Sequence, residues 1–251
     1  MYKHHEESIK NMINHYRENK AIRALFLIGS LATGTERSDS DIDAVAIIPK
    51  DYYEHKKKNE GLEEIYFGKC TYKGGYFNIH YMTYENLKEF ADKGTEVTRN
   101  MFSCAKPLFL DDLDLFRLVE KIPVFPKSEA AQKQFKFYCM LRMFYDYYWK
   151  ICNPRDYQRI HIMDGMIYSL YRLILLENEI LFPSMRKLEE YVERAPNKPE
   201  EIIRKCGNFM RTLSDEDCTA IVESYESWTS YNFPKDHNII MNNFDDPYER
   251  R

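Results

Sequence analysis

A single stretch of the chain decides its fold: residues 29–43, GSLATGTERSDSDID. It follows a short apolar run at residues 24–28, ALFLI, and it leads into a second one at residues 42–48, IDAVAII. Short apolar runs bounded by Gly and polar residues are typical of buried strands. We therefore predict a strand, a tight turn at Gly29-Ser30, a polar loop and a second strand.

The same stretch carries groups that can hold a phosphate and a metal ion. A strand that ends in Gly-Ser presents backbone N–H groups and a hydroxyl to phosphate oxygens, because Gly has no Cβ in the way. Asp41 and Asp43 stand at i and i+2, so on a strand both carboxylates point to one face. Two adjacent carboxylates repel each other unless a cation lies between them. Mg²⁺ suits such oxygen ligands and can bridge to substrate phosphates, so we expect it here.

The order Gly29-Ser30, polar loop, Ser40-Asp41-Ile42-Asp43 and apolar residues resembles the motif of the nucleotidyltransferase superfamily that includes DNA polymerase β. The helical half of the chain, including residues 181–188, LFPSMRKL, looks like the helical domain of aminoglycoside and lincosamide nucleotidyltransferases, which are the closest in appearance. The resemblance implies that Gly29, Ser30 and Ser40 bind the nucleotide. It implies that Asp41 and Asp43 are catalytic and bind Mg²⁺, which in two-metal chemistry stabilises the entering and leaving oxygens.

The family pattern usually includes a third carboxylate on a later strand, and this chain departs from it. The matching segment is residues 77–81, FNIHY, where Asn78 takes the place of the acid. Asn offers a metal a carbonyl oxygen but no charge and no base. His80 lies on the same face as Asn78 and can accept a proton or bind a metal. We expect Asn78 to be a metal ligand and His80 the catalytic base, unless His80 only makes a hydrogen bond at a strand end.

The predicted fold class is α+β, with two domains. We expect residues 1–125 to form a nucleotidyltransferase domain, a small mixed sheet flanked by helices, and residues 126–251 to form a helical bundle, which the resemblance implies binds the acceptor. The boundary lies at Pro123 and Pro126, which interrupt regular structure. Residues 73–75, Lys-Gly-Gly, predict a hairpin between strands at 65–72 and 76–82.

Apolar spacing and capping residues predict the helices. We expect one in the first twenty residues, one capped by Thr83 and one after residues 107–111. Two long helices follow, with apolar positions including Ile151 and Ile160, and the tail from Phe233 is expected to be loosely ordered. The expected helices after these are at residues 186–194, 199–212 and 215–225.

Some side chains of the helical half are candidates for acceptor contacts. Tyr145 or Trp149 could stack on a flat group in a cleft between the domains, and His161 with Asp164 could orient an acceptor. Core packing and a buried hydrogen bond are the alternatives for these two pairs. Glu177 and Glu179 would suit a cationic acceptor, but they could equally be helix-end charges.

Composition excludes several classes of protein. The chain of 251 residues is 44% hydrophobic and 30% charged, with a net charge of -4, which argues against a disordered chain and against an extended nucleic-acid surface. The six cysteines show no metal-binding or disulfide spacing. We see no membrane-spanning run and no signal peptide, and we expect a cytoplasmic protein.

The predicted function is Mg²⁺-dependent transfer of a nucleoside monophosphate from an NTP, with ATP the expected donor, to a hydroxyl of a small molecule. The partners are therefore an NTP and a small-molecule acceptor resembling an antibiotic. Two alternatives stay open: a catalytically weakened nucleotide-binding regulatory protein, suggested by Asn78, and a protein-modifying enzyme of the antitoxin type. The sequence does not indicate the oligomeric state.

Overall fold

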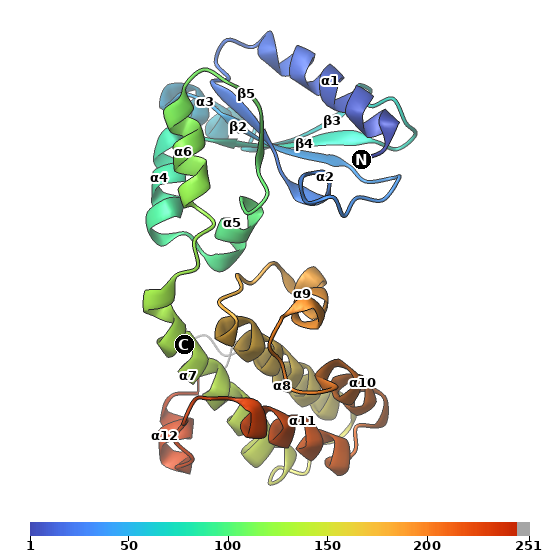
Figure 1. Cartoon of the computed structure of the whole chain (residues 1–251), viewed down its shortest axis with the longest axis vertical. Coiled ribbons are helices and arrows are strands. Elements are labelled where there is room, and N and C mark those ends of the chain that lie inside the picture. Colours follow the sequence, from blue (N-terminus) through green and yellow to red (C-terminus); the bar gives the residue numbers. More distant parts are fainter. Residues whose placement is uncertain (245–251) are drawn as a thin grey trace. The chain divides into compact units, whose positions relative to one another are not determined.

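The computed structural model describes residues 1–244. The chain divides into two compact units, unit 1 from Met1 to Val124 and unit 2 from Phe125 to Arg251. Unit 1 combines a β-sheet with helices, and unit 2 is a bundle of helices (Figure 1).

A five-stranded mixed sheet forms the centre of unit 1, with the strand order β3-β4-β2-β1-β5. Strands β2 and β4 are parallel, and the other neighbouring pairs are antiparallel. The strands are β1 (Ala24–Leu27), β2 (Ile42–Ile47), β3 (Glu63–Phe67), β4 (Tyr76–Met82) and β5 (Lys106–Leu110). The sheet therefore begins and ends with an edge strand, β3 on one side and β5 on the other.

Helices pack on both faces of this sheet (Figure 1). On one face, α1 (Lys3–Arg17) and α3 (Lys50–Asn59) join a core that includes Ile42, Phe77 and Ile79. On the other, α4 (Tyr84–Lys93), α5 (Glu96–Met101) and α6 (Leu113–Lys121) join a core that includes Val45. Side chains alternate between the faces with period two, so Asp43 and Asn78 project on the side of α4, opposite to Ile42 and Phe77.

Two local expectations for unit 1 are corrected, and a third is confirmed. Gly29-Ser30 does not form a tight turn but begins a short helix, α2 (Gly29–Thr33). The chain between β3 and β4 spans residues 68–75, because β3 ends at Phe67, so Gly74-Gly75 is part of a longer loop than a tight hairpin. The helix expected after residues 107–111 is confirmed as α6, and residues 107–110 themselves belong to β5, which pairs with β1. Tertiary pairing decided the conformation of this last segment, whose sequence carries little strand signal.

Unit 2 is helical throughout its described part. Its elements are α7 (Lys127–Arg142), a π-helical segment (Met143–Trp149), α8 (Asp156–Glu177), a 3-10 turn (Met185–Lys187), α9 (Leu188–Arg194), α10 (Ile202–Thr212), α11 (Asp215–Trp228) and α12 (His237–Asn242). The middle of α8 is buried on nearly all sides, from Gly165 to Leu176. It is the central helix around which the others pack.

The helical half also differs from some expectations. Ile151 and Ile160 are exposed, so the apolar stripes of the two long helices end short of them. The tail beyond Phe233 is not simply loose, because α12 buries Ile240 and the Phe233 ring stacks on Tyr138 with the centroids 4.1 Å apart. Residues 245–251 lie outside the described part. No helix within residues 1–244 has both the length and the apolar character that a membrane span requires.

Candidate active site

Asp43 and Asn78 are direct neighbours in the sheet. They are register partners on the parallel strands β2 and β4, and the Asn78 Nδ2 donates a hydrogen bond of 3.2 Å to Asp43 Oδ1. Directly opposed residues on neighbouring strands project to the same face. The position of the expected third acid therefore lies beside the second carboxylate of the motif.

Gly29 closes the other side of Asp43. Its backbone has φ +69°, a left-handed conformation, and a Cβ built on it would collide with Asp43 Oδ2 and lie 3.1 Å from Asp43 Cβ. Glycine is required here both by the backbone conformation and by the close approach. The carboxylate of Asp43 is thus held between the backbone at the start of α2 and the Asn78 amide.

Asp41 lies just before β2 and interacts with Tyr76, a residue that the sequence analysis did not select. A hydrogen bond from the Tyr76 hydroxyl to Asp41 raises the pKa of this phenol, and the negative charges of Asp41 and Asp43 add to the effect. Both carboxylates therefore lie within electrostatic reach of one hydroxyl. Period-two alternation on β4 places Tyr76 on the face of Asn78, and this signal could have identified it from the sequence.

The loop before Asp41 is held by hydrogen bonds of its own. Ser40 is buried, and its hydroxyl accepts a hydrogen bond of 2.9 Å from the Arg37 N–H. The Tyr72 hydroxyl donates to the Ser40 carbonyl at 2.5 Å. The expected nucleotide contact of Ser40 is therefore less direct than the sequence suggested, since its hydroxyl closes a turn that positions Asp41.

Ser30, in contrast, is available to a ligand. It is half-buried in the first turn of α2, where backbone N–H groups have no partner within the helix. Within residues 1–244, no hydrogen bond involves the Ser30 hydroxyl. Ser30 adjoins Gly29, so both groups lie at the Asp43 end of β1.

His80 lies two residues further along β4 than Asn78. It faces Val45 of β2 and Glu63 of β3. Alternate residues of a strand are about 7 Å apart, so His80 is offset by that distance from the row that Asp43 and Asn78 form. The structure places His80 on the expected face but not beside either aspartate.

The residues around Asp43 fit a divalent cation that binds oxygen. Asn78 Oδ1 is buried and has no hydrogen-bond partner among the described residues. A buried carbonyl oxygen without a partner is unfavourable, and a hard cation beside the two carboxylates would satisfy it. Within residues 1–244 no group of three or more His, Cys, Asp or Glu side chains could hold a metal, so any site here uses two carboxylates and an amide.

The candidates in unit 2 mostly have structural partners. Tyr145 and Trp149 are buried, with hydrogen bonds to Thr219 and to Asp215, so neither forms an open stacking surface. Asp164 is exposed. Glu177 and Glu179 also have partners within unit 2: Glu177 accepts hydrogen bonds from Tyr225 and Thr229, and Glu179 pairs with Lys127 at 2.7 Å.

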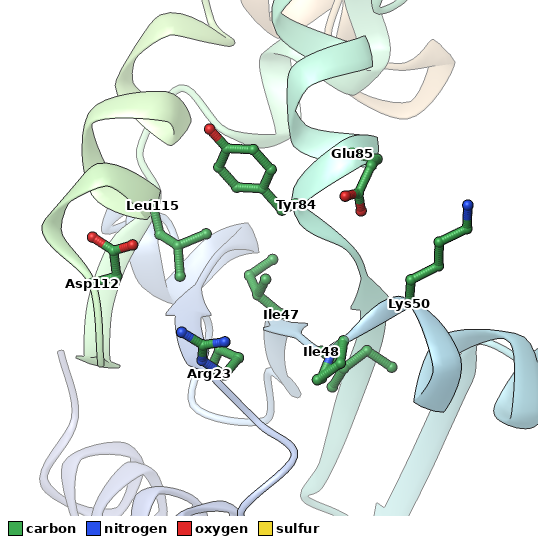
Figure 2. Close-up of a pocket in the computed structure, with 9 residues that line it drawn as sticks. Arg23, Ile47, Ile48, Lys50, Tyr84, Glu85, Asp112 and Leu115 are labelled. Atoms are coloured by element: carbon green, nitrogen blue, oxygen red, sulfur yellow. The ribbon is translucent and has the colours of Figure 1, made fainter.

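A cavity of about 340 Å³ in unit 1 lies away from these groups. It adjoins the opposite ends of β1 and β2, and Figure 2 shows Arg23, Tyr84 and Asp112 around an apolar floor that includes Ile47 and Leu115. Ile47 is four residues from Asp43 along β2, or about 13 Å. The lining of this cavity includes none of the residues of the motif at 29–43.

Comparison with known proteins finds a family match within unit 1. Residues 7–101 match the family model described as "Polymerase beta, Nucleotidyltransferase". Among solved structures, the chain is similar to a nucleotidyltransferase-like protein from Exiguobacterium sibiricum 255-15, with 12% sequence identity, a TM-score of 0.44, and 89% of this chain and 73% of that chain covered. No curated protein matches the sequence. The family match spans the segment from α1 to α5 and includes every residue of the candidate site.

Proposed function

Because residues 7–101 form a nucleotidyltransferase domain of the DNA polymerase β superfamily, we propose that this chain transfers a nucleoside monophosphate from an NTP to a hydroxyl of a small molecule. ATP is the proposed donor and Mg²⁺ the proposed cofactor. One observation carries the proposal: the Asp43 carboxylate is held between the Gly29 backbone and the Asn78 amide, whose oxygen is buried without a partner.

In the proposed reaction, the acceptor oxygen forms a bond to the α-phosphorus of the nucleotide. The bond between the α-phosphorus and the bridging oxygen to the β-phosphate breaks, and pyrophosphate leaves with that electron pair. The hydroxyl proton passes to a base, for which His80 is the proposed side chain on this face of the sheet.

The residues of unit 1 have distinct proposed roles. The Gly29 backbone and Ser30 bind the triphosphate, because the first turn of α2 presents N–H groups and a hydroxyl. Asp41, Asp43 and the Asn78 carbonyl oxygen would hold Mg²⁺. When bound, Mg²⁺ neutralises charge that develops on the phosphate oxygens. Tyr76 positions Asp41 through its hydroxyl.

An assay of pyrophosphate release tests this proposal. Purified full-length chain is incubated with ATP, Mg²⁺ and a panel of hydroxyl compounds that includes aminoglycosides, lincosamides and aryl glycosides, beside the variants Asp41→Asn and Asp43→Asn. We expect acceptor-dependent release that both substitutions abolish while the melting temperature is retained. Release that persists in Asp43→Asn would contradict the proposed site.

A second candidate is a regulatory protein that binds nucleotide without turning it over. The observation that favours it is the hydrogen bond from the Asn78 amide to Asp43, where the family pattern has an acid. Binding of MgATP without pyrophosphate release, before and after Asn78→Asp, would select this candidate. Restored release in Asn78→Asp would instead show that only the third charge is missing.

A further inference from the structure

The edge strand β3 exposes two large apolar side chains beside the candidate site. Ile65 is 55% exposed and Phe67 is 67% exposed. Ile65 is the register partner of Asn78, and Phe67 is the register partner of Tyr76. Directly opposed residues share a face, so both apolar side chains lie on the face that carries Asn78. We call Ile65, Phe67 and the ring of Tyr76 the β3 shelf.

The β3 shelf includes an aromatic pair. The rings of Phe67 and Tyr76 have centroids 5.4 Å apart and an angle of 48° between their planes. The residue between the two apolar ones, Tyr66, packs against the core on the opposite face of the sheet. The fold therefore uses Tyr66 for packing and leaves Ile65 and Phe67 to solvent.

Exposed apolar residues on an edge strand are a liability, because such edges pair with other chains. Proteins commonly place charges there, and Glu63 of β3 is one such charge on the same face. At Ile65 and Phe67 the chain has large apolar residues instead. Contiguous exposed apolar patches can mark binding surfaces, and here the two apolar side chains stand together beside the candidate site.

In the strand order, the β3 shelf and Gly29-Ser30 lie on opposite sides of β2. Gly29 and Ser30 follow β1, on one side of β2, while β4 and then β3 lie on the other side. In an in-line displacement the attacking and leaving oxygens stand on opposite sides of the phosphorus. If pyrophosphate leaves on the side of Ser30, the attacking hydroxyl approaches over Asn78. The rest of the acceptor then extends over β3.

We propose that the β3 shelf binds an aromatic portion of the acceptor, so that the acceptor is a hydroxyl compound carrying an aromatic ring and not a purely polycationic sugar. This inference rests on the proposed function. On this face of β3 only Glu63 is charged, whereas Ile65 and Phe67 are apolar and a flat ring can pack on Phe67 and Tyr76. The shelf selects the acceptor, while the nucleotide is bound on the side of Gly29.

Two probes that share their hydroxyl groups test the β3 shelf: 4-nitrophenyl β-D-glucopyranoside and methyl β-D-glucopyranoside. Each is titrated into full-length chain labelled at isoleucine methyl groups, with Mg²⁺ and α,β-methylene-ATP present, and binding is followed by NMR. We expect the Ile65 methyl signal to shift and the aryl glycoside to bind about tenfold more tightly than the methyl glycoside. Phe67→Ala should remove this difference, whereas the control Leu113→Ala, 66% exposed on α6, should retain it.

The possible outcomes separate the shelf from the proposed reaction. Equal affinity for the two glycosides, or a preference that Phe67→Ala leaves intact, would overturn the proposal. It would also be overturned if Phe67→Ala abolished only a concentration-dependent increase in molecular mass, since β3 would then be a contact between copies. Aryl preference that depends on Phe67, without binding of α,β-methylene-ATP, would support an aromatic site and contradict nucleotidyl transfer.

Discussion

The backbone of Gly29 lies against the carboxylate of Asp43, so closely that a Cβ on Gly29 would collide with Asp43 Oδ2. The two residues come from the ends of neighbouring antiparallel strands, and the Ile28 N–H donates to the Asp43 carbonyl at 3.0 Å. This contact brings the phosphate-binding and metal-binding halves of the motif together. It explains why a glycine precedes Ser30.

Gly29→Ala tests this contact, with Gly34→Ala as the matched control. Both glycines have positive φ, +69° and +74°, but a Cβ on Gly34 would meet nothing within 4 Å. Backbone strain should cost each variant about 1–3 kcal/mol of unfolding free energy. We expect only Gly29→Ala to lose binding of MgATP, measured by calorimetry. Equal binding by the two variants would show that the approach of Gly29 to Asp43 has no role in the site.

Asn78→Asp tests whether the site lacks only a charge. Without metal, the substitution sets two carboxylates directly opposite each other on β2 and β4, which should lower stability by about 1 kcal/mol at low salt. Mg²⁺ should restore the lost stability, because a cation between the carboxylates removes their repulsion. Melting temperatures with and without Mg²⁺ measure this effect.

Asn59→Asp, at the exposed end of α3, is the control for the charge change itself. Its melting temperature should not respond to Mg²⁺. If Asn78→Asp showed no more response to Mg²⁺ than this control, Asp43 and Asn78 would not form the metal site.

Much of unit 1 could be predicted from local sequence signals. The apolar runs at 24–28 and 42–48 became β1 and β2, and Thr83 caps α4 by accepting from the Asn86 N–H. Alternation around Ile79 placed Asn78 and His80 on one face because core-facing residues fixed the register. Each of these features depends on residues that are close together in the sequence, so the sequence alone is enough to predict it.

What could not be predicted depends on pairing between distant segments. Residues 106–110 form β5 because β1 offers them an edge. Tyr145 and Trp149 were candidates either for an acceptor contact or for core packing, and unit 2 buries both rings, with partners on α11 for their polar atoms. His80 is offset from Asp43 because β2 and β4 pair Asp43 with Asn78 and Val45 with His80. No local motif predicts this register.

Ser30→Ala and Ser40→Ala should have different effects. The Ser40 hydroxyl accepts from the Arg37 N–H, so its loss should lower stability by about 1 kcal/mol. Ser30→Ala should leave stability unchanged and weaken MgATP binding by about 1 kcal/mol, the typical value of one hydrogen bond. Chemical denaturation and calorimetry on both variants measure the two effects. Weaker folding in Ser30→Ala with unchanged affinity would contradict its role.

Glu177 makes the stability of unit 2 depend on pH. Burial raises the pKa of this carboxyl above its ordinary value of 4.5, although Tyr225 and Thr229 donate to it. A raised pKa in the folded state means that this group's stabilisation is complete below about pH 4.5 and is lost as pH rises through the folded pKa. Glu177→Gln should therefore be more stable than the native chain at pH 7, with the difference shrinking toward pH 4.

Glu179→Gln is the control for this pH dependence, because Glu179 is an exposed carboxylate only two residues away. Its stability relative to the native chain should show no gain at pH 7. Denaturation midpoints across pH 4–7 measure this difference, and parallel curves for Glu177→Gln and the native chain would rule out a destabilising, ionised Glu177.

A crystal structure of the full-length chain with Mg²⁺ and α,β-methylene-ATP is the most direct test of the proposed site. We expect the metal on Asp41, Asp43 and the Asn78 carbonyl oxygen, with the triphosphate over Gly29 and Ser30. Nucleotide bound instead in the cavity beside Arg23 and Asp112, or a metal that does not touch Asp43, would contradict it.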